Sequence, residues 1–220
     1  RFDEYGSAVA MKGDTALLGA PLEDAVEGGA HSVGAVYAFT KRDPGWHLAA
    51  RLVPPDGATG DLFGGAVALS PTASYVLVGA KHAFDTDAGK AYLFARDQST
   101  VSSGSSSAFE PPAPAVPASW SYTCTMSAAD RAVGDHFGTS IAISDRHAVI
   151  SAPGRSDSAG VVFVFEQKAD EWLCDTHRKL HSALPAAGNF FGASVALHRK
   201  LLVVGSPGAD LSAPYGVRAK

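Results

Sequence analysis

The sequence predicts an all-β fold built from a repeated unit of four short strands, and three observations lead to it. An aromatic–glycine pair recurs four times, at Tyr5-Gly6, Phe63-Gly64, Phe137-Gly138 and Phe191-Gly192. A triplet of mostly small residues follows each pair and closes an apolar run, at residues 19–21, 79–81, 151–153 and 205–207. Many of the 23 glycines and 13 prolines fall between such runs, as in proteins with many turns. A unit of this size cannot bury its own apolar surface, so the copies must pack against one another.

The first two strands of each unit follow the aromatic–glycine pair. The first strand is short, consists of small residues and ends on Val or Ile followed by Ala, at residues 7–10, 65–68, 139–142 and 193–196. Small side chains suit a place where several sheets converge. The second strand is apolar throughout, at residues 16–18, 76–78, 148–150 and 201–204. Because unbroken apolar strands are buried on both faces, we expect it to lie between neighbouring sheets.

The third and fourth strands are broader and more aromatic. The third follows a glycine and alternates with period two, at residues 34–39, 89–94 and 160–165, so its aromatic side chains share one face. The fourth opens with tryptophan, at residues 46–52, 120–126 and 172–180. Four strands that progress from small to bulky side chains describe a wedge. Wedges arranged around an axis form a β-propeller, whose blades are four-stranded antiparallel sheets.

At these residues the chain resembles the FG-GAP repeat family, whose repeats form the blades of integrin α-subunit heads. The resemblance covers nearly the whole chain apart from residues 97–118. It indicates one FG-GAP β-propeller region over residues 1–220, with repeats at about 1–54, 55–126, 127–180 and 181–220, the last incomplete. Propellers of this family usually have about seven blades, so the resemblance implies that the four visible repeats belong to a larger propeller.

Residues 97–118 interrupt the second repeat. A serine tract is followed by Pro111-Pro112 and two further prolines, the composition of a flexible arm that leads into a stiffer polyproline segment. The sequence therefore predicts a disordered insertion. It either has no role or serves as a docking or O-glycosylated arm.

The calcium loop of integrin-type repeats does not recur here. The first and second strands are joined at residues 12–14, 70–74, 144–146 and 198–200, where too few oxygen ligands are present for the six to eight that calcium takes. Asp85-Thr86-Asp87 lies in another loop and is interpreted as a solvated acidic turn. His177 and His181 stand four apart in an expected strand, where no Cys or carboxylate completes a zinc set. We therefore expect no metal, no cofactor and no catalytic centre in this chain.

Composition limits the partners. A formal net charge of −4 argues against a nucleic-acid surface. No apolar stretch approaches the roughly 20 residues of a membrane span, so direct membrane insertion is not expected. Cys124 and Cys174 fall in the outer strands of different repeats, where the bridging distance is demanding, and this favours two unpaired thiols over a disulfide.

The family resemblance implies a non-enzymatic, extracellular or cell-surface module that binds protein or acts as a scaffold. A carbohydrate-binding propeller is one alternative, for which Phe84 and Phe190 are the candidate loop aromatics. An accessory domain of a larger surface hydrolase is another. Fold alone does not determine function, so these readings rest on the analogy.

One face of the predicted propeller is acidic. The connections between repeats should share a face with the loops between the second and third strands, and together these segments carry 13 of the 22 acidic residues. Only Lys81, Arg131 and Arg155 oppose them, which gives a formal balance of −10. We expect this face to engage a protein partner with a basic surface, or a glycan. The alternative is that the carboxylates only keep the face soluble. The candidate partner-binding residues are Asp56, Asp61, Asp85, Asp87, Asp130, Asp135 and Asp157.

Overall fold

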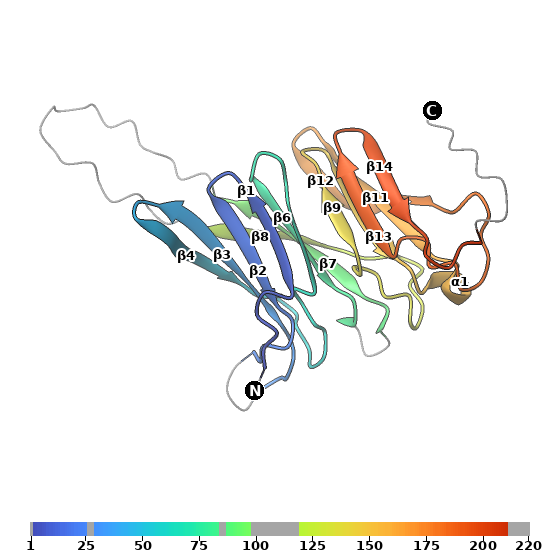
Figure 1. The fold of residues 1–220 in the computed structure, drawn as a ribbon, viewed down its shortest axis with the longest axis horizontal. Coiled ribbons are helices and arrows are strands. Elements are labelled where there is room, and N and C mark those ends of the chain that lie inside the picture. Colours follow the sequence, from blue (N-terminus) through green and yellow to red (C-terminus); the bar gives the residue numbers. More distant parts are fainter. Residues whose placement is uncertain (1, 26–28, 84–86, 98–118, 211–220) are drawn as a thin grey trace, which may run out of the picture.

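A computed structural model describes residues 2–25, 29–83, 87–97 and 119–210. Within these residues the chain forms three four-stranded antiparallel sheets, one two-stranded antiparallel sheet and a single four-residue helix, α1 (Arg155–Ser158). The sheets stand side by side like the blades of a fan (Figure 1). The predicted all-β class with blade-like sheets is confirmed, and closure into a ring of about seven blades stays a prediction. The predicted insertion lies, apart from Asp97, outside the described residues.

Every apolar run expected to be a strand is one, in the expected order. Blade 1 holds β1 (Ala8–Lys12), β2 (Thr15–Ala20), β3 (Ala35–Arg42) and β4 (Gly45–Leu52). Blade 2 holds β5 (Ala66–Leu69), β6 (Tyr75–Ala80), β7 (Lys90–Arg96) and β8 (Trp120–Met126). Blade 3 holds β9 (Ile141–Ile143), β10 (His147–Ala152), β11 (Val161–Lys168) and β12 (Glu171–Leu180). In blade 4 the structure describes β13 (Ser194–His198) and β14 (Leu201–Gly205).

The core lies between blades rather than within one. The innermost strands β1, β5, β9 and β13 are neighbours, which explains their small side chains. The ring of Phe63 is fully buried among residues of blades 1 and 2 and meets Tyr92 edge to face, with ring centroids 5.4 Å apart. Phe137 repeats this arrangement one blade further, 5.2 Å from Phe163. The recurrent aromatic residue is therefore the apolar contact that joins one blade to the next.

The glycine that precedes each third strand makes this contact possible. Gly34 and Gly89 have φ of 91° and 83°, and a Cβ on either would overlap the carbonyl oxygen of the next blade's Phe63 or Phe137. The close approach lets the amide of Phe63 donate to the carbonyl of Val33 at 2.9 Å, and equivalent bonds form at the two later junctions. Only glycine combines this backbone conformation with such proximity.

The two outermost blades expose apolar side chains. Val9 and Met11 of β1 are each 69% exposed, and Leu201 and Val203 of β14 are 63% and 60% exposed. The prediction that second strands are buried on both faces holds for β6 and β10 and is wrong for β14. The physical reason is that, among the described residues, only blade 3 packs against blade 4.

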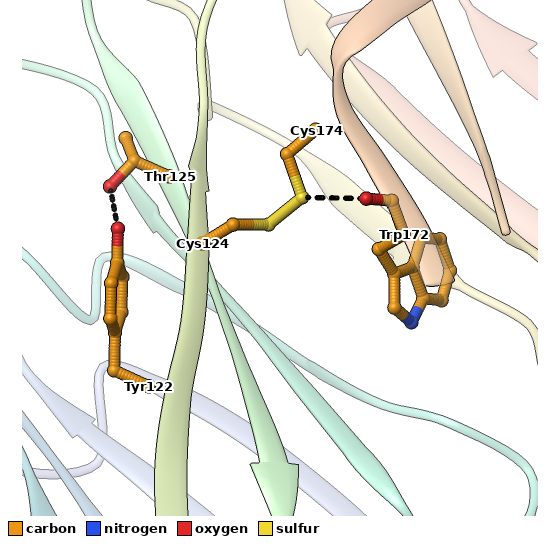
Figure 2. The surroundings of a disulfide bond; sticks show 5 residues. All are labelled: Tyr122, Cys124, Thr125, Trp172 and Cys174. Carbon is orange, nitrogen blue, oxygen red and sulfur yellow. Dashed lines mark hydrogen bonds between the residues drawn. A yellow bond between two sulfur atoms is a disulfide. The ribbon is translucent and has the colours of Figure 1, made fainter. Parts of the chain in front are cut away.

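The expectation of two unpaired thiols is also wrong. Cys124 on β8 and Cys174 on β12 form a disulfide that joins blades 2 and 3, with Cα atoms 6.4 Å apart (Figure 2). The outer strands of these blades lie close enough for the bond because the packing of Phe137 and of Tyr75 against Trp172 brings the sheets together. The Cys174 sulfur lies 3.5 Å from the Trp172 carbonyl oxygen, a contact without a hydrogen atom because a disulfide sulfur has none to donate.

Candidate interaction face on the loop side

The long connections gather on one side of the fan, as the sequence predicts. We call this side the loop face; its described part comprises residues 21–25, 29–34, 53–65, 81–83, 87–89, 127–140, 153–160 and 181–193. Backbone hydrogen bonds join the segments, from the Gly60 amide to the His31 carbonyl at 2.9 Å and from the His136 amide to the Asp87 carbonyl at 3.0 Å. Loops from consecutive blades therefore form one continuous surface.

Two buried aspartates shape this surface from inside. Asp61 and Asp135 precede the aromatic–glycine pairs by two residues, and each is only 3% exposed. Their carboxylates accept the amide hydrogens of Ala58 and Ala132, both at 2.9 Å, and so fix the turn that delivers the phenylalanine to the core. Asn189 occupies the same position in blade 4 and is 8% exposed. Two of the predicted partner-binding residues are thus turn-forming residues below the surface.

Asp135 also anchors a cation. Its Oδ2 lies 2.6 Å from a guanidinium nitrogen of Arg155, whose side chain is 14% exposed. The same guanidinium reaches Asp130 at 2.6 Å and lies over the ring of Phe163. Hydrogen bonds to charged groups are stronger than neutral ones when shielded from water, so this arrangement ties the β10–β11 loop to the β8–β9 loop.

The rim of the loop face carries two equivalent carboxylates, each five residues before a buried aspartate. Asp56 is 53% exposed and accepts hydrogen bonds from Lys90 at 2.7 Å and Tyr92 at 2.8 Å. Burial raises the pKa of Asp56, but the hydrogen bonds from Lys90 and Tyr92 outweigh it, and the pKa is lowered overall. Burial and the bond to Asp56 raise the pKa of Tyr92.

Asp130 takes the same place one blade further. It is 55% exposed and accepts a hydrogen bond from the Lys179 ammonium at 2.5 Å in addition to the Arg155 contact. The hydrogen bond from Lys179 lowers the pKa of Asp130 below its ordinary value. Both rim carboxylates are therefore held ionised and half exposed.

The remaining predicted residues lie apart from this pattern. Asp87 is 52% exposed and pairs with His82 at 2.9 Å. Asp157 is exposed in helix α1 with φ of 56°. Asp85, Phe84 and the centre of the predicted acidic turn fall outside the described residues. Phe190, the other candidate loop aromatic, is 43% exposed.

Three strand residues that the charge count omitted reach the loop face. Arg51, Lys90 and Lys179 pair there with Glu23, Asp56 and Asp130. With them, six basic residues stand against eleven acidic ones among the described residues of this face and the adjoining residues 3–4 and 210, a formal balance of −5. The recurrence of Asp at the same motif position in blades 2 and 3 is the sequence signal that could have revealed the two rim sites.

His177, for which the sequence predicts no zinc site, lies among aromatic side chains. Its ring packs against Phe163 and Phe165, with centroids 5.0 and 5.2 Å apart, and burial lowers its pKa. Across the described ranges no three His, Cys, Asp or Glu side chains gather as a metal set would require. Likewise no helix in this part of the chain is long and apolar enough to cross a membrane.

The repeat motif decides the family. The sequence profile of the FG-GAP repeat matches residues 1–39, 46–94 and 120–165, which correspond closely to blades 1, 2 and 3. The chain belongs to the FG-GAP repeat family. No curated protein matches it at a significant level. In this FG-GAP chain the motif positions that recur include those that join neighbouring blades, while the groups paired with the rim carboxylates differ from blade to blade.

Proposed function

We propose that this FG-GAP chain is a non-enzymatic, extracellular or cell-surface module that binds a protein partner through its loop face. The family assignment supports a β-propeller-type binding module. The observation that carries the finer proposal is the rim of the loop face, where half-exposed, ionised carboxylates stand on rigid blades. Long loops on a rigid scaffold are where binding usually resides.

The disulfide supports the extracellular part of the proposal. Cys124 and Cys174 are the only cysteines of the sequence, and both are used in one bond between blades. Such bonds form and persist in oxidising compartments and are rare in the cytosol. Labelling intact cells with a membrane-impermeant amine reagent tests the location. Labelling of the protein supports the proposal, and labelling only after lysis contradicts it.

The rim supports an acidic recognition surface. Asp56 and Asp130 are each partly neutralised by their cations, yet half of each side chain faces solvent and the face retains negative charge. Complementary charge steers association and contributes specificity, so a basic patch on a protein partner fits this surface. Association should weaken as salt rises because exposed charges are screened.

Two aspartates offer a matched pair of variants. Asp157 and Asp170 are both exposed in the left-handed conformation, Asp157 on the loop face and Asp170 in the turn between β11 and β12 on the opposite side. Asparagine adopts this conformation readily, so Asp157→Asn and Asp170→Asn remove charge without disturbing the backbone. We expect Asp157→Asn to lower the affinity of a partner captured from the native source several-fold, and Asp170→Asn to leave it unchanged. Equal effects on both faces, or none on the loop face, would contradict the proposed surface.

A further inference from the structure

The side of the fan opposite the loop face carries a basic cleft between blades 3 and 4. We call this side the turn face; it holds the turns β1–β2, β5–β6, β9–β10 and β13–β14. The cleft has a volume of about 300 Å³ and is lined by Ser144, Asp145, Arg146, His147, Arg199 and Lys200. This volume is at the lower end of the range of small-ligand sites, about 300–1,000 Å³. Three lining residues are cationic and one is anionic.

The cationic groups of the cleft are not neutralised by neighbours. In the described part of the chain neither Arg146, Arg199 nor Lys200 takes part in an ion pair. The carboxylate of Asp145 accepts a hydrogen bond from the Thr72 hydroxyl at 3.0 Å, on the blade 2 side of the same turn. The cleft of blade 1 differs, because Asp14 and Asp43 balance Lys41 and Arg42 there. The positive excess is therefore a local property of blades 3 and 4.

Arg199 adopts an unusual backbone conformation. Its φ is 55°, the same value as that of Gly13 at the equivalent position of the blade 1 turn. A glycine takes this left-handed conformation freely, whereas an arginine takes it against steric resistance. Ala73 has the same φ of 55° in the turn between β5 and β6. An arginine followed by a lysine thus stands where blade 1 has glycine and aspartate, at a cost in backbone conformation.

We propose that this cleft binds a tetrahedral oxyanion, that is, a sulfate or phosphate group. The guanidinium groups of Arg146 and Arg199 supply forked N–H donors, and the Lys200 ammonium adds a point charge. The Ser144 hydroxyl braces the β9–β10 turn, since it donates to the His147 carbonyl at 3.3 Å and accepts the His147 amide hydrogen at 3.0 Å. The site lies on the face opposite the proposed protein-binding surface and does not depend on it.

Blade 1 supplies a variant that should remove the site without unfolding the chain. The double substitution Arg199→Gly and Lys200→Asp installs the Gly13-Asp14 turn in blade 4. It relieves the left-handed arginine, so the melting temperature should not fall. The control is Lys12→Ser with Lys41→Asp, which makes the same change in net charge on the turn face of blade 1.

The test is a titration of the isotope-labelled full chain with sodium sulfate, followed by amide chemical shifts, against sodium chloride at equal ionic strength. We expect saturable shifts at residues 144–147 and 198–200. The Arg199→Gly/Lys200→Asp variant should bind about tenfold more weakly or worse, because it loses charge-assisted hydrogen bonds. The blade 1 control should bind as the unmodified protein does.

Two further probes distinguish the source of the oxyanion. Inorganic phosphate and a heparin-derived sulfated disaccharide are titrated in the same way. Tighter binding of the disaccharide than of inorganic sulfate assigns the cleft to a sulfated glycan, and tighter binding of phosphate assigns it to a phosphorylated ligand. Shifts that only follow ionic strength for every probe overturn the proposal, as does undiminished binding by the Arg199→Gly/Lys200→Asp variant.

Discussion

The junction between blades 1 and 2 and the junction between blades 2 and 3 share an inner design and differ at the outer edge. Inside, Phe63 and Phe137 occupy the same position, each against a glycine of the preceding blade. Outside, blades 2 and 3 are joined by the Cys124–Cys174 disulfide, which has no counterpart between blades 1 and 2. The inner contacts repeat because each blade must meet the next, whereas the outer strands can be fastened in different ways.

The rim shows the same contrast. At the first junction Asp56 binds one ammonium and one phenol, from Lys90 and Tyr92. At the second, Asp130 binds the cations of Arg155 and Lys179, and Arg155 continues to the buried Asp135. The second junction therefore carries a connected ionic network as well as a covalent bond.

The inner contacts should contribute more to the free energy of unfolding than the disulfide or the ion pairs do. Phe63→Ala and Phe137→Ala should each lower the free energy of unfolding by about 3–5 kcal/mol, because each leaves a cavity at a blade junction. Phe63→Ala should also expose blade 1 to hydrogen exchange, since no disulfide holds its outer strand to blade 2. In Phe137→Ala the disulfide should keep the outer strands together. Phe190→Ala at an exposed ring is the control, and a loss as large as that of Phe63→Ala would contradict the assigned core.

Removing the disulfide should have the second-largest effect on stability. Replacing both cysteines by serine removes a bond between residues 50 apart in sequence and should cost about 2–4 kcal/mol of stability. Hydrogen exchange should rise in β8 and β12 and stay unchanged in β1 and β2. Titration of thiols in the unreduced, denatured protein provides the direct check, and two free thiols would show that the pair is unbonded.

Asp135→Asn should lower stability by about 1–3 kcal/mol, because it removes the charge that faces the largely buried Arg155. Asparagine can still accept the Ala132 amide hydrogen. The loss of unfolding free energy measured in urea therefore reports mainly the lost ion pair with Arg155. In an Arg155→Ala background the same change should cost much less. Additive losses in the double-mutant cycle would show that the two side chains do not interact.

The rim carboxylates should have the smallest effect on stability, and it should appear as a dependence of stability on pH. The pKa values of Asp56 and Asp130 are lowered from 3.8 in the folded state. Their contribution is therefore present above about pH 4 and is lost as pH falls through the folded-state values. Because both side chains are half exposed, each contributes under about 1 kcal/mol. The Asp56→Asn/Asp130→Asn variant should lose less stability than the unmodified protein between pH 5 and pH 2, by urea unfolding, and parallel curves would contradict this.

The sequence alone was sufficient for the strands, their order and the family. The Phe63-Gly64 and Phe137-Gly138 pairs, the apolar second strands and the glycines before the third strands are local patterns, and local spacing determines which residues enter a strand and which face the core. The shared side of the long loops also followed, because strand order in an antiparallel blade decides which connections lie at the same end. For the candidate face, the sequence placed Asp56 and Asp130 among the loop residues of the side on which the structure shows them.

The tertiary structure decided which side chains meet across blades. Cys124 and Cys174 are separated by 50 residues, Asp130 and Lys179 by 49, and Asp56 and Lys90 by 34. No local pattern relates such residues, because their contact depends on how closely and at what angle whole blades pack. The burial of Asp61 and Asp135, the pairing of the acidic rim and the open basic cleft between blades 3 and 4 were decided in the same way.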